Sequence, residues 1–139
     1  MRKSPLSYQN DESKIVVLYV DDEQNNLNSF QAHFRRNKNY LIITANSAEE
    51  ALVVLTVVSV QIIITDQKMP NMTGVEFLEE SIKKTPEPIK IVVTAHKDIT
   101  PIIEAYNNGL IFQYHEKPWN FEDLEKSIEE GFIAYCQQK

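Results

Sequence analysis

The sequence has a single cysteine, no apolar segment of membrane-spanning length and a deficit of basic residues. Because Cys136 has no partner in the chain, an internal disulfide is excluded, which is typical of proteins from a reducing compartment. A membrane-spanning helix needs about 20 consecutive apolar residues. The N-terminus also lacks the apolar core of a signal peptide. These absences predict a cytoplasmic protein with no membrane contact.

Acidic residues outnumber basic ones, 20 Asp and Glu against 14 Lys and Arg, which gives a formal net charge of -6. A surface of this sign repels phosphate backbones, so direct binding of nucleic acid is not expected. The 139 residues suffice for one domain, and a 42% apolar share is ordinary for a globular protein. We assign residues 14–139 to this domain and residues 1–13, which are polar and aperiodic, to a mobile N-terminal tail.

Short apolar runs alternate with amphipathic segments along the whole domain. Each run is too short for a helix and lacks polar alternation, which is typical of strands buried on both faces of a sheet. The predicted strands are 15–20, 40–44, 62–64, 89–93 and 110–114. Apolar residues at helical spacing predict a first helix that ends near 37 and further helices over about 47–57, 75–82, 100–107 and 120–135. The valines of 47–57 also suit a strand.

Capping residues support the helix boundaries. Ser47 and Thr73 are each followed three residues later by a glutamate, the pattern of a capping box. Thr100 and Pro101 fit the N-cap and the first helical position, and Asn120 fits the N-cap of the last helix. The fourth helix is predicted to stop at the Asn-Asn-Gly segment 107–109.

Five strands that alternate with five helices predict an α/β fold with a parallel sheet and right-handed crossovers. Because helices cover both faces of such a sheet, we expect a three-layer doubly wound (βα)5 domain. The commonest small version has strand order 2-1-3-4-5 and binds its ligand outside the carboxyl ends of the strands, between the first and the third.

Polar residues follow four of the predicted strands at the point where each strand ends. Asp21 and Asp22 follow the first strand, Asp66 the third, Thr94 the fourth and Lys117 the fifth. The four strands are successive neighbours in the predicted order, about 4.8 Å apart. We therefore expect all five side chains to converge at one edge of the sheet.

Such a cluster suits phosphoryl transfer. Three neighbouring carboxylates repel one another unless a cation intervenes, and hard oxygen ligands favour Mg²⁺. Lys117 supplies a point charge for a phosphate, and the Thr94 hydroxyl can donate a hydrogen bond to a phosphoryl oxygen. A carboxylate can itself act as the nucleophile and form an aspartyl phosphate.

Four fragments of the sequence resemble the response-regulator receiver domain of two-component signalling, which is CheY-like. They are Tyr-Val-Asp-Asp-Glu at 19–23, Thr-Asp-Gln-Lys-Met-Pro at 65–70 with Gly74, Val-Thr-Ala at 93–95, and Tyr114 with Lys117-Pro118. The resemblance spans about residues 14–135. Each fragment alone is weak evidence, whereas all four in this order are highly specific for the family.

The resemblance implies roles for the site residues. Asp66 would be the phosphoacceptor of a two-component phosphorelay, charged by a sensor histidine kinase or a phosphotransfer protein. Asp22, Asp66 and the backbone carbonyl of Lys68 would bind Mg²⁺ directly, and Asp21 would act largely through water. Lys117 would contact the phosphoryl group, and the Lys117–Pro118 peptide bond would be cis.

The resemblance also implies a switch and an output. Thr94 would move toward the phosphoryl group and Tyr114 would turn inward. Residues 98–135 would then form the face that binds an effector domain or a second copy of the chain. Lys68 and His96 occupy positions that tune dephosphorylation in the family; their effect here stays open, although a solvent-facing His96 is favoured. Trp119 is expected to pack under the last helix rather than to bind a ligand.

Two other functions were weighed against the phosphoacceptor, which as a slowly self-dephosphorylating switch would not be an enzyme. A flavodoxin-like electron carrier needs a phosphate-binding loop after the first strand, and the acidic residues 21–24 would repel a flavin phosphate. A Mg²⁺-dependent aspartyl-phosphate phosphatase shares the residue types of the site. Its nucleophile, however, belongs to an Asp-x-Asp motif on the first strand, and a cap domain is missing from this sequence.

Overall fold

The computed structural model describes residues 14–95, 97 and 99–138. The tail predicted at 1–13, His96 and the first residue of the expected output face lie outside the described residues.

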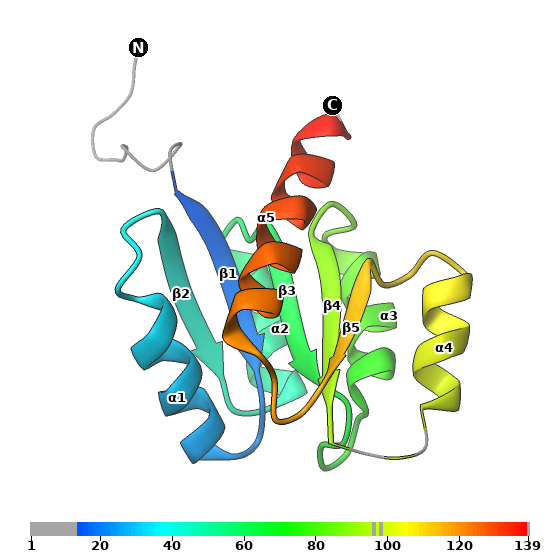
Figure 1. The fold of residues 1–139 in the computed structure, drawn as a ribbon. Coiled ribbons are helices and arrows are strands. Elements are labelled where there is room, and N and C mark those ends of the chain that lie inside the picture. The colour runs from blue at the N-terminus through cyan, green and yellow to red at the C-terminus, as the bar shows by residue number, and fades with distance from the viewer. Residues whose placement is uncertain (1–13, 96, 98, 139) are drawn as a thin grey trace.

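Five parallel strands form the sheet at the centre of the molecule (Figure 1). They are β1 (Ile15–Val20), β2 (Tyr40–Ala45), β3 (Ile62–Asp66), β4 (Ile89–Thr94) and β5 (Gln113–Glu116). Their order is β2-β1-β3-β4-β5. β1 and β3 are direct neighbours, with Val20 paired to Thr65. The predicted doubly wound fold and its strand order are confirmed.

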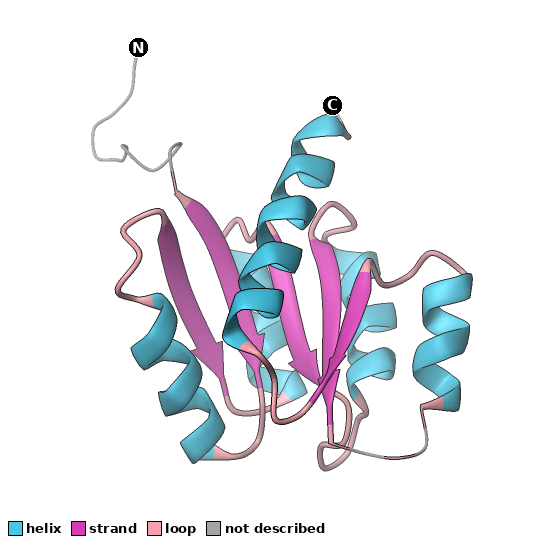
Figure 2. Ribbon diagram, in the orientation of Figure 1, coloured by secondary structure: helices cyan, strands magenta, loops and turns pink. Residues whose placement is uncertain are grey.

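Five helices connect the strands and cover both faces of the sheet (Figure 2). They are α1 (Gln24–Phe34), α2 (Ala48–Val57), α3 (Gly74–Lys84), α4 (Thr100–Asn107) and α5 (Phe121–Gln137). α1 and α5 lie on one face, while α2, α3 and α4 lie on the other (Figure 1). The strand arrowheads all point to the same edge, so the loops after β1, β3, β4 and β5 meet there.

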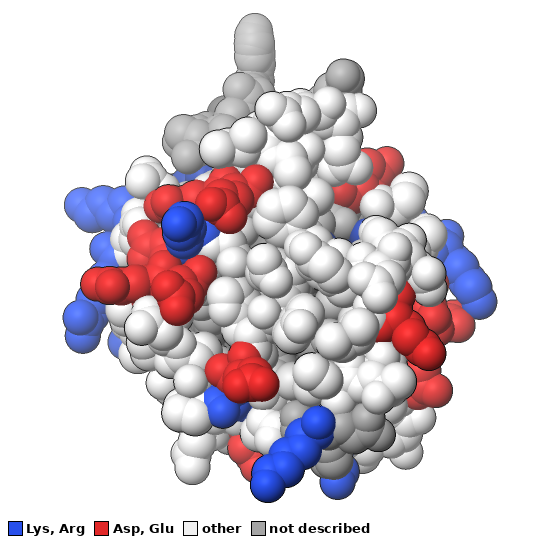
Figure 3. Space-filling view, turned by 45° about the vertical axis from the view of Figure 1, so that its right-hand side comes forward, with Lys and Arg blue, Asp and Glu red and all other residues white. Residues whose placement is uncertain are grey.

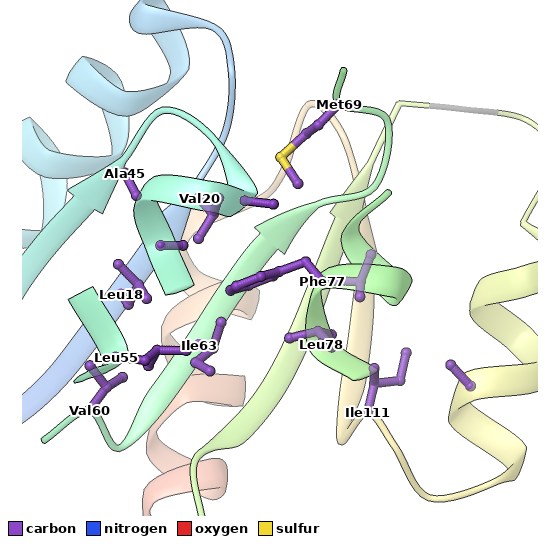
Figure 4. Packing of buried hydrophobic residues seen from close by; sticks show 14 of the residues in the cluster. Leu18, Val20, Ala45, Leu55, Val60, Ile63, Met69, Phe77, Leu78 and Ile111 are labelled. Atoms are coloured by element: carbon purple, nitrogen blue, oxygen red, sulfur yellow. The ribbon is translucent and has the colours of Figure 1, made fainter. Parts of the chain in front are cut away.

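Each face of the sheet has its own apolar cluster. On the α2–α4 face, Leu18, Ile63 and Phe77 are fully buried and pack with residues from the helices above them (Figure 4). On the α1–α5 face, Tyr19 and Phe30 belong to a second cluster. The side chains of consecutive strand residues point to opposite faces, which is why β1 contributes Leu18 to one cluster and Tyr19 to the other. Both clusters end at the edge where the strand-terminal polar residues lie.

The predictions for the helix N-termini hold in two cases and need correction in two. Thr73 and Glu76 form the complete capping box of α3, and Asn120 Oδ1 accepts from the Asp123 N–H at the start of α5. Ser47 accepts from the N–H of Glu50, but the Glu50 carboxylate accepts from Asn46 N instead of closing the box.

The start of α4 is the second correction. Its N-cap is Ile99, so Thr100 is the first helical residue and Pro101 the second. A proline is tolerated there because the first four N–H groups of a helix have no intrahelical acceptor.

The fifth strand begins three residues later than predicted and ends two residues later. Gly109 has φ of 82°, and the N–H groups of Leu110 and Ile111 donate to the carbonyl of Ala105 at the end of α4. These apolar residues therefore close the helix, and Ile111 joins the core on that face. The ladder to β4 begins with the N–H of Phe112, which donates to Lys90 O. Similarly, α1 ends at Phe34 rather than near 37. A turn follows it, in which the Asn37 N–H donates to Phe34 O.

His115 makes the stability of this fold depend on pH. Its Nε2 lies 2.8 Å from Ser127 Oγ on α5, and burial lowers the pKa of His115 although Asp123 opposes this shift. An unfolded-state imidazole has a pKa of about 6.5, so the unfolded state takes up the proton first as pH falls. The contribution of the neutral, buried His115 to the free energy of unfolding is complete above about pH 6.5. It is lost as pH falls through the lowered pKa of the folded state.

We therefore expect His115→Gln to flatten the pH dependence of the free energy of unfolding between about pH 5 and 7. Urea unfolding of wild type and variant at matched pH values measures it. A variant that keeps the wild-type slope would show that other groups set this dependence.

Candidate metal and phosphoryl site

Three carboxylates lie together where β1 and β3 end. Asp21 and Asp22 directly follow β1, and Asp66 is the last residue of β3. Each offers an oxygen, and these oxygens all lie within 4.8 Å of one another. Asp21 and Asp66 are buried, whereas Asp22 is exposed. This is the convergence predicted from the parallel sheet, and the donor set consists of the hard oxygens that Mg²⁺ prefers.

Asp21 is held by hydrogen bonds on both of its oxygens. Oδ1 accepts from the backbone N–H of Glu23 at 3.0 Å. Oδ2 accepts from the Tyr19 hydroxyl at 2.7 Å, from Lys117 Nζ at 2.8 Å and from Asn26 Nδ2 at 3.1 Å. These four donors fix the orientation of the Asp21 carboxylate. Tyr19 and Asn26 are not among the site residues predicted from the sequence.

Asp66 is in a less favourable environment. Burial and the neighbouring charge of Asp21 raise the pKa of Asp66 to about 6, although Lys117 and the N–H of Gln67 act in the opposite direction. The structure thus holds a carboxylate whose charge is only partly compensated by the protein. A cation at this position would stabilise the ionised form.

Lys117 connects the two buried carboxylates. Its ammonium lies 2.8 Å from Asp21 Oδ2 and 3.2 Å from Asp66 Oδ1. Burial lowers the pKa of Lys117, but the two carboxylates raise it by more, so the net shift is upward and the side chain stays charged. Its backbone N–H donates to Thr94 O, and the Lys117–Pro118 peptide bond is cis as the family resemblance implies.

Hydrogen bonds and a close backbone contact hold the loop after β3 against Asp66 and Gln67. The Gly74 N–H donates to Gln67 O, and the Val75 N–H donates to Gln67 Oε1, both across the loop. A Cβ at Gly74 would collide with the backbone carbonyl oxygen of Asp66. Asn71 has φ of 72°, which tightens the turn. The first turn of α3 therefore packs directly on the backbone that carries the Asp66 carboxylate.

A cavity of about 740 Å³ opens over these groups. Its charged lining residues include Asp22, Asp66, Lys68 and Lys117, and its apolar lining residues include Pro118, Trp119 and Phe121. Trp119 also packs edge-on against Phe121 at the start of α5, with ring centroids 5.8 Å apart, as expected from the sequence. Its ring lies 5.8 Å from Lys117 Nζ, so it is also a wall of the site.

The two residues predicted to switch lie on the neighbouring strands β4 and β5. Thr94 is buried at the end of β4, where it pairs in register with Glu116. Tyr114 is half-buried on β5 and packs against the cluster on the α2–α4 face. Its ring lies 6.0 Å from that of Tyr106 on α4. The structure thus brings Thr94 to the site edge and Tyr114 to the outer side of the sheet.

This geometry matches a known family. The response regulator receiver domain matches residues 17–129. The chain belongs to this family. As a receiver domain it has a phosphoacceptor role in two-component signalling, and nothing in the comparisons favours a phosphatase. Receiver domains bind Mg²⁺ at an acidic pocket, which fits the three carboxylates described above.

The receiver resembles one part of longer regulators. It is 36% identical over 123 residues to the hydrogenase transcriptional regulatory protein HoxA of Cupriavidus necator, which covers 88% of this chain and 25% of that protein. It is 28% identical over 96 residues to the DNA-binding transcriptional regulator NtrC of Klebsiella pneumoniae, which covers 69% of this chain and 20% of that protein. The chain thus spans a quarter or less of the length of these relatives.

Solved structures show the same fold. A CheY-like response regulator receiver domain protein from Methanospirillum hungatei is 28% identical, has a TM-score of 0.83 and covers 91% of this chain and 100% of its own. The response regulator protein TrrA from Thermotoga maritima, solved in complex with Mg²⁺–BeF, is 26% identical with a TM-score of 0.74. That likeness covers 84% of this chain and 98% of TrrA.

In the described part of the chain, the helices lack the combination of length and apolarity needed to cross a membrane.

Proposed function

We propose that Asp66 is the phosphoacceptor of this receiver. One observation carries the choice among the three carboxylates: Asp66 both lines the cavity and pairs with Lys117. Asp21 pairs with Lys117 but is 0% exposed and already accepts four hydrogen bonds. Asp22 lines the cavity, but its carboxylate is exposed on the rim.

The proposed reaction transfers a phosphoryl group from a histidine of a sensor histidine kinase or a phosphotransfer protein. A carboxylate oxygen of Asp66 forms the new P–O bond while the P–N bond to the donor imidazole breaks. The imidazole nitrogen leaves with the electron pair and takes up a proton from solvent. Phosphoryl transfer of this kind requires in-line positioning and charge stabilisation more than further covalent chemistry.

Asp22, Asp66 and the backbone carbonyl of Lys68 would hold Mg²⁺ directly, with Asp21 acting largely through water. When bound, this ion would neutralise charge on the transferred phosphoryl oxygens. Lys117 would exchange its contact with Asp66 for one with the phosphoryl group, and its neighbour Thr94 would donate a hydrogen bond to it. Both side chains already lie at the edge of the sheet where the phosphoryl group would form.

We infer that the output surface is the face predicted at 98–135. Figure 3 shows a broad uncharged area bordered by acidic and basic groups on the side that carries β5 and α4. Exposed apolar side chains within residues 98–135 include Ile103 and Tyr106 of α4 and Ile133 of α5. Tyr106 also contacts Tyr114, so an inward turn of Tyr114 would alter this surface directly. An effector domain or a second copy of the chain would bind here.

The relatives suggest which kind of output to expect. Two of them are named as transcriptional regulators, and each is at least four times longer than the matched region. We propose that this receiver controls an effector of that class by being phosphorylated, and that it acts as a regulatory domain rather than as an enzyme. Steady-state release of phosphate from a phosphate ester would contradict this, because a switch is labelled once and decays slowly.

The test uses beryllofluoride, an analogue of a phosphoryl group. With Mg²⁺ present, we expect chemical-shift or fluorescence changes at Thr94, Tyr114 and Trp119 in the wild type and none in Asp66→Asn. Asp123→Asn is the matched control, because this carboxylate lies in the first turn of α5 away from the cavity, and it should respond like the wild type. A response that persists in Asp66→Asn would overturn the assignment of the phosphoacceptor.

A further inference from the structure

Tyr19 is fully buried on β1, and its hydroxyl reaches the acidic site. Asp21 directly follows β1 and lies two positions after Tyr19, so the two side chains extend to the same side of the sheet. The hydroxyl donates to Asp21 Oδ2 at 2.7 Å. In the sequence, residue 19 is part of a family motif, and no role is predicted for its side chain.

The phenol ring is fixed by aromatic neighbours. It stacks on Phe30 of α1 with ring centroids 4.3 Å apart and an interplanar angle of 4°. Trp119 packs edge-on against it at 5.7 Å. A fully buried ring held on two sides keeps its hydroxyl in one direction. The hydrogen bond to Asp21 is therefore already in place before a ligand binds.

The donors on Asp21 Oδ2 differ in what they can do during the reaction. Lys117 also pairs with Asp66, and under the proposed function it would turn toward the phosphoryl group. Asn26 donates at a longer distance of 3.1 Å from the first turns of α1. Tyr19 is neutral and packed in the core, so it can keep its bond to Asp21 when the lysine contact weakens.

We propose that Tyr19 is a positioning residue that holds the Asp21 carboxylate in the orientation needed for Mg²⁺ binding. The proposal rests on the proposed function, because it takes the cluster of Asp21, Asp22 and Asp66 as the metal site. A group that hydrogen-bonds to a carboxylate of a metal site fixes the orientation of that carboxylate without contacting the metal. The loss of such a group lowers metal affinity about 10- to 100-fold.

Tyr19→Phe tests this because it keeps the ring and removes only the hydroxyl. We expect the Mg²⁺ dissociation constant, measured by isothermal titration calorimetry, to rise about tenfold. The Mg²⁺ concentration that half-saturates phosphorylation by a small acyl phosphate should rise by the same factor. The rate at saturating Mg²⁺ should stay within about threefold of wild type, because Asp66 and Lys117 are unchanged.

Tyr40→Phe is the matched control. Its hydroxyl is also buried, has no hydrogen-bond partner among the described residues and lies at the start of β2, away from the site. This variant should bind Mg²⁺ like the wild type, and urea unfolding checks that both variants are folded at the titration temperature. An unchanged Mg²⁺ affinity in Tyr19→Phe, or an equal loss in both variants, would overturn the proposal. Failure of the proposed function would instead appear as labelling of Asp66→Asn, whatever Tyr19 does.

Discussion

In Mg²⁺-free buffer at pH 7, Asp66→Asn is expected to be more stable than the wild type by about 1 to 3 kcal/mol, since each unit of pKa shift corresponds to about 1.4 kcal/mol. Burial, and then the charge of Asp21, raise the pKa of Asp66 to about 6 even though Lys117 is present. Folding at neutral pH must therefore ionise a carboxyl group in a site that disfavours its charge. An amide of the same shape removes that cost.

The pH dependence gives the prediction its sign. The folded state binds the Asp66 proton more tightly than the unfolded state, whose carboxyl has a pKa of about 3.9. On account of this group, the stability of the wild type falls as pH rises from about 4 to 6 and is level above that. The advantage of Asp66→Asn should therefore be absent near pH 4 and complete near pH 7.

Urea unfolding at pH 4, 5, 6 and 7 measures this difference. Saturating Mg²⁺ should reduce or reverse it, because a cation bound to the wild-type cluster stabilises the folded state. Asp123→Asn is the control, since it removes a carboxylate from the first turn of α5, where negative charge is favourable, and should not stabilise the protein. Equal unfolding midpoints at pH 7, or a gain that does not depend on pH, would show that charge at Asp66 does not limit stability.

The sequence was sufficient for the sheet and the core of the site because both follow from short-range rules. The apolar runs that became β1, β3 and β4 are buried almost throughout and have polar residues at their ends, whereas β2 and β5 at the sheet edges are partly exposed. Once the strands are parallel, their carboxyl ends must share an edge. Asp21, Asp66 and Lys117 therefore meet although they are separated by 96 positions at most. The same logic could be applied to any sequence of this pattern.

The sequence was insufficient where the backbone of apolar residues caps the end of a helix. Leu110 and Ile111 fit a strand by type, yet Gly109 turns the chain so that their N–H groups satisfy the Ala105 carbonyl. The choice between ending α4 and starting β5 depends on how α4 packs, and local propensity does not contain that information. Similarly, Glu50 fits a capping box by sequence, but the Glu50 carboxylate accepts from the backbone N–H of Asn46 instead.

Supporting residues of the site were missed for a different reason. Tyr19 is of a residue type common in buried strands, and its packing against Phe30 and Trp119 directs its hydroxyl to Asp21. Asn26 on α1 reaches the same carboxylate from five positions further along the chain. A signal was available for Tyr19, since its side chain extends to the same side of the sheet as that of Asp21 two positions later. A buried hydroxyl at such a position is expected to have a hydrogen-bonding partner.

Gly74→Ala is expected to destabilise the protein by about 3 kcal/mol or more, at the upper end of the cost of overpacking. The added methyl group would collide with the Asp66 carbonyl oxygen and lie 3.1 Å from Gln67 Cα, and both are backbone atoms that cannot rotate away. The Gly74 N–H also donates to Gln67 O across the same loop. The start of α3 must therefore move away from β3, and Asp66 must move with its backbone.

Gly109→Ala separates this effect from the ordinary cost of replacing a glycine. A Cβ there meets nothing within 4 Å, but φ of 82° strains any other residue, so a loss of about 1 kcal/mol is expected. Urea unfolding should rank wild type above Gly109→Ala and Gly109→Ala well above Gly74→Ala. Beryllofluoride binding should weaken only in Gly74→Ala, because that substitution displaces Asp66. If the two variants unfold at the same midpoint, the close contact between α3 and the backbone of Asp66 does not determine the stability of the site.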